Sequence, residues 1–420
     1  MNAEELKSIN PWWKGEKISE ELAKPYKRRV FKEILELAKY RQILILSGLR
    51  RVGKSTLIFQ YIEFLINRKV NPLNILYFSF DISINELTEI LKVYESITGI
   101  DWKNEKVFVF LDEIQKLKDW GNKIKLLYDN FPKLKFVVSG SSSVMLEKEA
   151  IATLAGRYFL IEVKPLSFLE FLELKRSKID LKRIELWEEE IKKEFESYVK
   201  RPFPEIFDWS NEILIKKYIR ESIVDKVLHV DLMQKFKDVN PEILNKLVEI
   251  FYSSPGIYLN YDTLSKDLKV SKKVLMRHMF YLEFSYLIRK VRNLRTGALI
   301  SSRKLQKVYP FHWSLVLGIT GFNNLYESIV SSLIDAKFYW RKNGKEVDFI
   351  VKNKKIKAIE VKEGEKITNE ELKNLVYFCL KNNLKRAMVV YSGEEKTLSI
   401  KGINIELVPI WKFCLSHNNL

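Results

Sequence analysis

The sequence has few cysteines, histidines, glycines and prolines. Two cysteines in 420 residues, Cys379 and Cys414, exclude a disulfide framework, and we interpret both as small buried apolar residues. The four histidines are scattered, which excludes a histidine metal site. With 15 glycines and 11 prolines, the chain contains no low-complexity block. These shortages leave a chain that is globular over nearly its whole length.

Long apolar runs are also missing, since no window approaches about eighteen consecutive apolar residues. The first residues lack the basic and then apolar pattern of a secretion signal, so we expect a cytoplasmic protein without a membrane partner. A chain of 420 residues exceeds the size of one hydrophobic core. Its 46% of hydrophobic residues can fill several cores, which predicts about two to four domains.

The chain does have an excess of positive charge. Its formal net charge is +18, which favours a polyanionic partner such as nucleic acid. The alternative is a surface dense in ion pairs, as in heat-adapted proteins. Half of the excess, a net +9, lies between Pro255 and Val308. The charge is therefore concentrated, as a nucleic-acid contact requires.

The first chemical motif follows an apolar run at 42–47 that is typical of a buried parallel strand. The motif fits GxxxxGK[ST], and the apolar spacing of 57–65 predicts a helix after it. Glycines allow backbone N–H groups to surround phosphates, Lys54 would reach the β- and γ-phosphates, and Ser55 would bind Mg²⁺. The alternative is a degenerate loop. The predicted ATP-binding residues are Gly48, Leu49, Arg50, Arg51, Val52, Gly53, Lys54, Ser55 and Thr56.

Two further strands end in polar side chains. The strand at 107–111 is followed by Asp112, which would hold the Mg²⁺ shell, and by Glu113, the predicted general base for the attacking water. The strand at 134–139 ends at Ser139, which with Ser141 is a candidate sensor of the γ-phosphate. The alternative for these serines is a turn that caps the next helix.

Beyond Pro165 the pattern is helical and heavily charged to about residue 237. We then predict a helix at 241–252, a second from 263 capped by Asp262, and a third at 272–284 after the cap Ser271. Strands at 286–291 and 304–309 complete the order of a winged helix. Its predicted DNA contacts are Lys272, Lys273, Arg277, Arg292 and Arg295. The alternative is a winged helix that packs against protein.

The C-terminal segment combines a helix from 325, a strand at 337–341, its hairpin partner from 346, and a strand at 358–362. Side chains alternate across a strand, so Glu360 and Lys362 share one face. With Asp348, they resemble the Asp and Glu-x-Lys arrangement of PD-(D/E)XK nucleases, and Glu327 matches the acid carried on the helix. Asp348 and Glu360 would be the metal ligands and Lys362 would orient water or stabilise charge.

The loop 49–52 and the segments 74–81, 111–115, 139–142 and 154–157 resemble a prokaryotic, largely archaeal family of AAA+-related ATPases. The resemblance implies a P-loop, parallel-sheet α/β ATPase domain at 1–165 and a helical lid at 166–240. A winged helix at 241–312 and an α/β PD-(D/E)XK nuclease-like domain at 313–420 would follow. It further implies that Arg157 acts at the γ-phosphate or at a subunit interface, with a structural ion pair as the alternative.

We therefore expect an enzyme that hydrolyses ATP with Mg²⁺ and acts on double-stranded DNA, either as a single chain or as a homo-oligomer. Cleavage of DNA by the C-terminal domain and an inert binding role for it both stay open. The competing hypothesis is a nucleotide-controlled switch that binds protein partners.

Overall fold

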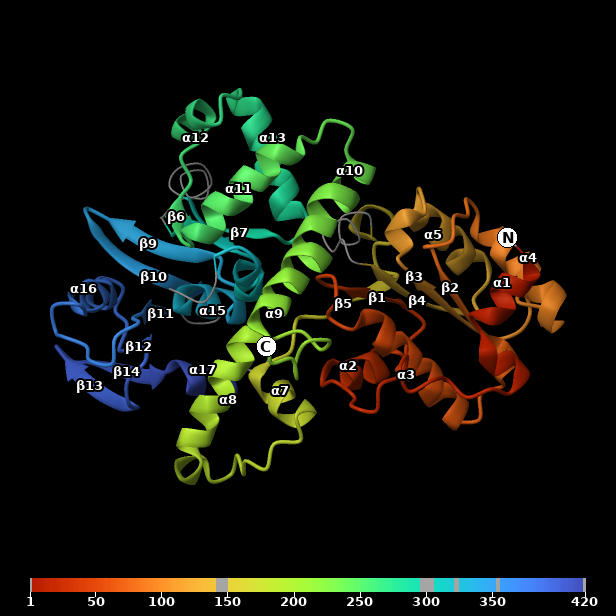
Figure 1. Cartoon of the computed structure of the whole chain (residues 1–420), viewed down its shortest axis with the longest axis horizontal. Helices are drawn as coiled ribbons and strands as arrows, with labels where there is room; N and C mark the ends of the chain where they lie inside the picture. The colour runs from red at the N-terminus through yellow and green to blue at the C-terminus, as the bar shows by residue number, and fades with distance from the viewer. Residues whose placement is uncertain (1, 141–149, 295–305, 321–324, 353–355, 418–420) are drawn as a thin grey trace. The chain divides into compact units, whose positions relative to one another are not determined.

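The computed structural model describes residues 2–140, 150–294, 306–320, 325–352 and 356–417 (Figure 1). The chain divides into two compact units, an N-terminal unit, Met1–Pro165, and a C-terminal unit, Leu166–Leu420. Ser141 and Arg295, two of the predicted site residues, lie outside the described residues.

The N-terminal unit is built on a parallel sheet of five strands in the order β2-β3-β4-β1-β5. Every residue of β1, β3 and β4 is buried, because helices cover both faces of the sheet (Figure 1). The strands are β1 (Ile43–Ser47), β2 (Ile75–Ser79), β3 (Val107–Asp112), β4 (Leu134–Gly140) and β5 (Tyr158–Glu162).

Alternation along the strands divides their apolar side chains between two layers. Ile43 and Ile45 face the core formed with α1, α4 and α5, whereas α2 contacts β5 and α3 contacts β4. The helices are α1 (Ala3–Ser8), α2 (Val30–Leu37), α3 (Lys54–Asn67), α4 (Leu87–Thr98) and α5 (Trp120–Asn130), with short 3-10 turns η1 (Pro11–Lys14), η2 (Pro72–Asn74) and η3 (Ile114–Lys116).

The C-terminal unit begins with helices, as the charged pattern predicted. Ser167 and Glu170 form a capping box at the start of α7, in which each side chain bonds the other residue's backbone N–H. The elements are α7 (Phe168–Leu174), η4 (Ile184–Leu186), α8 (Glu188–Lys200) and α9 (Glu212–Ile219), which continues through the wider π turns η5 (Arg220–Asp225) and η6 (Val227–Asp231) into α10 (Leu232–Lys235).

The helices expected for a winged helix are present, with one correction. The second of them begins at Tyr261, and its cap is Asn260, whose side chain accepts bonds from the N–H groups of Asp262 and Thr263. Asp262 lies in the first turn because Asn260 already fills the cap position. Ser271 caps the third helix, as predicted. The elements are α11 (Pro241–Ser253), β6 (Ile257–Tyr258), α12 (Tyr261–Asp267), α13 (Lys272–Phe284), β7 (Ile288–Asn293) and β8 (Gln306–Pro310).

Nine strands of this unit form one sheet in the order β13-β14-β12-β11-β10-β9-β7-β8-β6. Parallel pairing of β7 with β9, at Arg292 and Phe338, joins the strands of the expected winged helix to those that follow. The remaining elements are η7 (Trp313–Gly318), α15 (Tyr326–Leu333), β9 (Phe338–Lys342), β10 (Lys345–Lys352), β11 (Ile356–Val361), α16 (Lys373–Lys381), β12 (Arg386–Tyr391), β13 (Lys396–Ile400), β14 (Ile403–Pro409) and α17 (Ile410–Ser416).

Both cysteines are buried and free, as the sequence predicted. Cys379 lies on the buried face of α16, and burial raises the pKa of its thiol to about 11. Among the helices that the structure describes, none is long and apolar enough to cross a membrane.

Candidate active site

The loop between β1 and α3 has the backbone of a phosphate cradle. Gly53 has a φ of 90° and precedes the first helical residue, and Arg51 has a φ of 64°. Left-handed residues within a turn direct neighbouring N–H groups to one side, which makes an anion-binding concavity at the positive end of α3. Leu49 and Val52 are buried and anchor the loop.

Lys54, the first residue of α3, is buried inside this loop. Its Nζ donates to the carbonyl oxygens of Gly48, at 3.1 Å, and Leu49, at 2.7 Å. The ammonium is thereby held within the turn of backbone that would surround phosphates. Arg50 and Thr56 are half-buried, and Arg51 is exposed.

Asp112, at the carboxyl end of β3, is the centre of a buried polar group. Ser55 Oγ donates to its Oδ2 at 2.6 Å, Tyr77 OH donates to the same oxygen at 3.4 Å, and Ser139 Oγ donates to Oδ1. Burial raises the pKa of Asp112, and the adjacent Glu113 raises it further. A free carboxylate is therefore costly here, and a bound cation would lower that cost.

The residues around Asp112 fit a magnesium site. A serine hydroxyl and a carboxylate in contact supply the oxygen ligands that Mg²⁺ prefers, and Mg²⁺ needs only one or two protein ligands because it keeps waters. Ser55 and Asp112 would hold it. When bound, the metal would neutralise charge on the phosphates of ATP.

Glu113 follows at a backbone position with a φ of 52°. The side chain is half-buried, and Gln115 Nε2 donates to its Oε2. A residue other than glycine adopts this conformation uncommonly and at a cost in conformational energy. The structure leaves the predicted role of Glu113 as a general base a prediction.

Gly48 shows how closely the loop packs against the end of the N-terminal unit. Its φ is 152°, and an added Cβ would lie 2.1 Å from the carbonyl oxygen of Val163. Val163 N also donates to Ser47 O at 2.6 Å. Only glycine fits this close approach.

Sequence reasoning missed Arg28, which is buried beside the same loop. Its Nη1 donates to the carbonyl oxygens of Val52, at 2.9 Å, and Lys164, at 2.8 Å, and its Nη2 donates to Pro165 O at 3.1 Å. The guanidinium thus joins the loop to the last residues of the unit. In the basic run Lys27-Arg28-Arg29, no pattern distinguishes this arginine from its neighbours.

Arg157 lies at the end of the sheet where β1 begins, opposite the phosphate loop. Its carbonyl accepts from Ile43 N at the start of β1, whereas the phosphate loop follows the end of β1. Its Nε and Nη2 bind both oxygens of Asp129, at 2.8 and 3.1 Å. This placement fits the structural ion pair and does not fit a γ-phosphate contact within the same chain.

Comparison with known proteins finds a domain match over this site. Residues 40–172 match the AAA domain. The N-terminal unit carries an AAA-type P-loop ATPase domain. The match supports the binding and hydrolysis of ATP by this unit. Residues 194–325 and 324–413 match two domains of unknown function, DUF8612 and DUF4143.

Similar proteins extend over most of the chain. An uncharacterized protein of Methanocaldococcus jannaschii is 27% identical over 405 residues, which are 90% of this chain and 89% of the relative. An uncharacterized protein of Haemophilus influenzae is 26% identical over 386 residues, 88% of this chain and 94% of the relative. Among solved structures, a Walker-type ATPase of Pyrococcus abyssi has a TM-score of 0.41 at 16% identity, covering 70% of this chain and 95% of that chain. The ORC2 protein of Aeropyrum pernix, in its ADP form, has a TM-score of 0.32 at 12% identity, covering 73% and 88%.

The C-terminal unit contains a second buried ionic cluster, apart from the AAA domain. Asp348 on β10 and Glu360 on β11 are buried on neighbouring strands. Asp348 Oδ2 accepts from Val361 N at 2.9 Å, and Glu360 Oε1 accepts from Lys362 Nζ at 2.8 Å. Burial raises the pKa of Asp348 to about 6, and Glu327 on α15 contributes to this shift. The structure therefore brings the four predicted residues together.

This cluster contains a buried carboxylate oxygen without a hydrogen-bond partner among the described residues. Glu360 Oε2 is buried and has no hydrogen-bond partner in the described part of the chain. Burial raises the pKa of Glu360 to about 8, and the charge of Asp348 raises it as well. The described residues contain no group of three His, Cys, Asp or Glu side chains that could hold a metal. Mg²⁺ would thus be held through Asp348 and Glu360 with waters, and it would polarise a phosphate.

Sequence reasoning missed two members of the cluster. Lys307 Nζ lies 2.5 Å from Glu346 Oε1 and 4.0 Å from Asp348 Oδ1, and Tyr309 OH donates to Glu327 Oε2 at 2.7 Å. Lys307 and Tyr309 are two residues apart on β8, so they share a face. The alternation of side chains along a strand, which places Glu360 and Lys362 on one face, also predicts that Lys307 and Tyr309 share a face.

The predicted DNA contacts differ in how far their charges are compensated. Lys272 pairs with Asp262 at 2.5 Å, and Arg277 pairs with Asp238. Lys273, in the first turn of α13, and Arg292, on β7, are exposed and form no ion pair with the described carboxylates.

Proposed function

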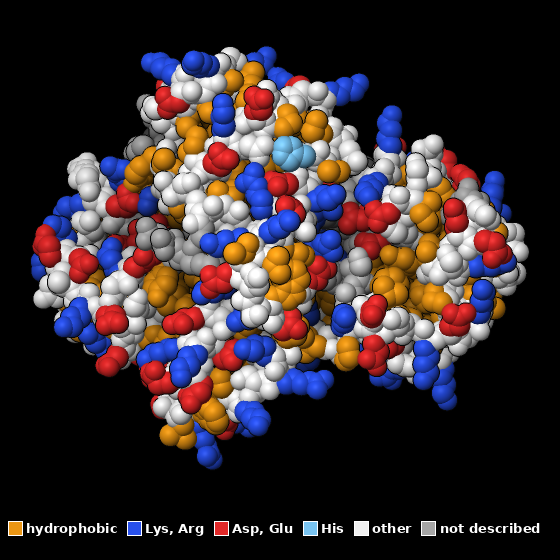
Figure 2. Space-filling view, viewed as in Figure 1, with side chains coloured by type: hydrophobic (Ala, Val, Ile, Leu, Met, Phe, Trp, Pro, Cys, Tyr) orange, Lys and Arg blue, Asp and Glu red, His pale blue; other side chains and the backbone are white. Residues whose placement is uncertain are grey.

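We propose that this protein is a DNA-directed ATPase, in which the AAA domain hydrolyses ATP and the C-terminal unit binds duplex DNA. Charge supports the DNA role, because half of the net positive charge of the chain lies between Pro255 and Val308. On the face in view, Lys and Arg side chains are mixed with Asp and Glu (Figure 2). The order α11, β6, α12, α13, β7, β8 supports the winged-helix proposal, in which α13 would be the recognition helix.

Lys273 and Arg292 are the side chains on which the DNA proposal depends most. Replacing both with Gln should weaken duplex binding and lower the salt-dependence slope by about 1.8, since each phosphate contact contributes about 0.9. Binding is measured by fluorescence anisotropy over a salt series. Lys385→Gln with Arg386→Gln, at exposed positions of the same unit, is the matched control. An unchanged slope would remove these residues from the interface.

Coupling between ATP hydrolysis and duplex binding is tested by measuring the ATPase rate with and without duplex DNA. We expect DNA to stimulate the wild-type rate, and Lys54→Ala to remove hydrolysis under both conditions because it deletes the charge aimed at the phosphates. A rate that is indifferent to DNA at saturating concentrations would contradict a DNA-directed ATPase.

We further propose that the ionic cluster around Asp348 and Glu360 is a PD-(D/E)XK-like site that cuts DNA with Mg²⁺. The arrangement of α15, the hairpin β9–β10, and β11 supports this assignment, as does the unpartnered Glu360 Oε2. Plasmid nicking with Mg²⁺ and with EDTA is the direct test. Absence of nicking with Mg²⁺ would leave the domain a binding role.

One observation favours the second candidate function, a nucleotide-controlled switch that binds protein partners. On α13, Met276 is 53% exposed and Phe280 is 38% exposed, and they lie four residues apart on the same side of the helix. Apolar side chains on the outer face of a recognition helix suit a protein surface better than phosphates. Met276→Ser with Phe280→Ser should leave duplex binding unchanged if DNA is the partner. Both proposed functions are compatible with a homo-oligomer in which Arg157 lies at the subunit interface.

A further inference from the structure

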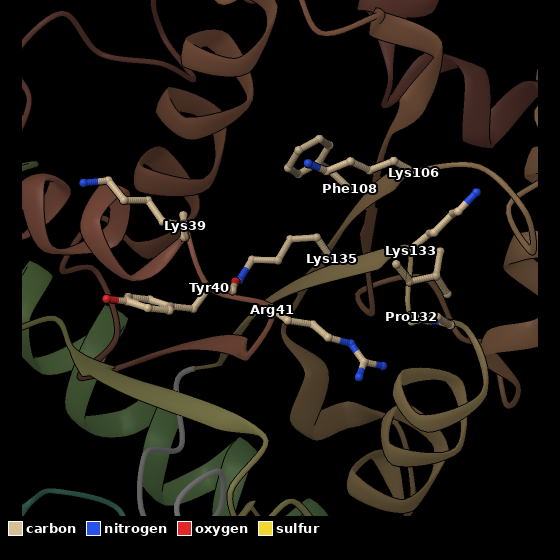
Figure 3. Close-up of a pocket in the computed structure, with 10 residues that line it drawn as sticks. Lys39, Tyr40, Arg41, Lys106, Phe108, Pro132, Lys133 and Lys135 are labelled. Carbon is tan, nitrogen blue, oxygen red and sulfur yellow. The ribbon is translucent and has the colours of Figure 1, made fainter.

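A basic pocket lies at the amino edge of the ATPase sheet, where β1, β3 and β4 begin (Figure 3). Its volume is about 470 Å³, and it is lined by residues from three segments, 38–41, 106–108 and 132–135. Five of the lining side chains are cationic: Lys39, Arg41, Lys106, Lys133 and Lys135.

This pocket does not belong to the nucleotide site. The phosphate loop and Asp112 follow the carboxyl ends of β1 and β3, and the pocket lies where these strands start. The six residues of β3 span about 20 Å at about 3.3 Å per residue. ATP bound at the loop therefore does not reach these cations.

The positive charge of the pocket is mostly uncompensated. Lys39 pairs with Glu36 at 2.7 Å. The other four form no salt bridge with a described carboxylate. Lys133 donates to Asn104 O, and Lys135 donates to two backbone carbonyl oxygens. Arg41 donates to Tyr128 O and stacks on that ring, and Lys106 lies 5.3 Å from the Phe108 centroid. Asp129 interacts electrostatically with Arg41, but Arg157 binds both of its oxygens.

Lys135 gives the pocket an unused donor. The residue is only 6% exposed, and its Nζ donates to Tyr40 O at 2.7 Å and to Gln42 O at 2.5 Å. An ammonium has three donors, so one is left without a partner in the described structure. Burial, together with the charge of Lys106, lowers the pKa of Lys135 to about 8. An anionic oxygen in the pocket would accept a hydrogen bond from the free donor and would raise the pKa of Lys135 again.

The form of the pocket suits a strand rather than a rigid duplex. The cations are distributed around a hollow on three segments, and Tyr40, one of the lining residues, is 58% exposed. A basic groove beside an exposed aromatic ring is the arrangement that binds single strands, because the phosphates meet cations while a base stacks on the ring. We propose that this pocket binds the phosphate backbone of a single DNA strand.

This inference rests on the proposed action on DNA and adds a second contact on the AAA domain. Its test uses the full chain and a labelled single strand of about 15 nucleotides, a length within the range that such grooves cover. Lys106→Gln with Lys133→Gln changes two exposed side chains, so the fold is kept. Lys17→Gln with Lys32→Gln, exposed elsewhere on the same unit, is the control for lost charge.

We expect the pocket variant to bind the strand about tenfold more weakly and to lower the salt-dependence slope by about 1.4, from about 0.7 for each contact on a single strand. Duplex binding and the ATPase rate without DNA should stay within about twofold, because neither uses this pocket. The control variant should match the wild type in all three measurements.

Three outcomes would overturn the inference. If the pocket variant keeps the wild-type slope on the strand while Lys273→Gln with Arg292→Gln lowers duplex binding, the pocket proposal fails and the DNA function stands. If the pocket variant weakens strand and duplex equally, the assignment to a single strand fails. If the wild type binds neither at low salt, both the pocket proposal and the DNA function fail.

Discussion

At the scale of single residues, the ATPase site depends on the separate roles of neighbouring acids. Asp112 is buried and bonded to Ser55 and Ser139, whereas Glu113 is half-buried on a left-handed turn. We predict that the first holds a cation and that the second accepts a proton from water. Two adjacent carboxylates can serve different functions because the backbone turns between them.

Glu113→Gln should therefore retain ATP binding and slow hydrolysis by about 10²-fold or more, the usual contribution of a general base. The cradle and the contacts of Asp112 are unchanged in this variant. Binding of a fluorescent ATP analogue and the steady-state ATPase rate together measure the effect. Glu33→Gln, an exposed position on α2, is the control. Turnover at the wild-type rate would show that another group is the base.

At the scale of elements, Gly48 is the position where the phosphate loop packs directly against the backbone of Val163. Gly48→Ala should lower both the melting temperature and ATP affinity, because the new Cβ would lie 2.1 Å from Val163 O and must displace the loop. Gly99→Ala is the matched control, since that glycine has a φ of 73° and nothing within 4 Å of the added Cβ. The control should lose about 1 kcal/mol from backbone strain alone and should bind ATP normally.

If both glycine variants lose equal stability and neither loses ATP affinity, the close approach of Val163 has no effect on the site. Calorimetry and nucleotide titration separate the two quantities.

The packing of β4 gives a prediction about pH. Burial lowers the pKa of Lys135 to about 8 in the folded chain, whereas an unfolded lysine has a pKa near 10.4. Between these values the unfolded chain binds more protons, so this residue's contribution to stability rises with pH from about 8 upward and is constant below that. Lys135→Met should remove this part of the pH dependence.

The measurement is the free energy of urea unfolding at pH 7.5 and 9.5 for the wild type and the variant. The free energy of unfolding of the wild type, relative to that of the variant, should be larger at pH 9.5 than at pH 7.5. Buried tyrosines such as Tyr61, whose pKa burial raises to about 12, act in the opposite direction in both proteins and cancel in the difference. A difference that is independent of pH would contradict the lowered pKa of Lys135 in the folded chain.

At the scale of the whole molecule, two acidic sites lie in two separate units. Asp112 belongs to the N-terminal unit, and Asp348 belongs to the C-terminal unit. Asp348→Ala should therefore remove Mg²⁺-dependent nicking without lowering ATP hydrolysis in the absence of DNA. Asp112→Asn should abolish hydrolysis and leave basal nicking unchanged. Loss of both activities in either variant would show that the chemistry of the two units is shared.

Local sequence was enough to predict the phosphate loop and the end of β3, because both motifs are continuous in the chain. Strand, glycine-rich loop and helix follow one another at 43–67, and the backbone of the loop depends on glycines that the sequence shows directly. The hairpin at Asn343 and Gly344 was predictable for the same reason, since both residues adopt the positive φ that a two-residue turn requires. The cap of α12 was wrong by two residues, because Asn260 and Asp262 are both good caps.

Tertiary structure alone decided which distant side chains meet. Arg28 reaches Val52 and Pro165, and Lys307 reaches Asp348, only because the fold brings separate segments into contact. The basic pocket is likewise assembled from three segments that are separate in the sequence and adjacent where parallel strands begin together. Periodicity shows which face of an element a residue occupies. It does not show which other element will cover that face, because that depends on strand order and on the packing of the whole core.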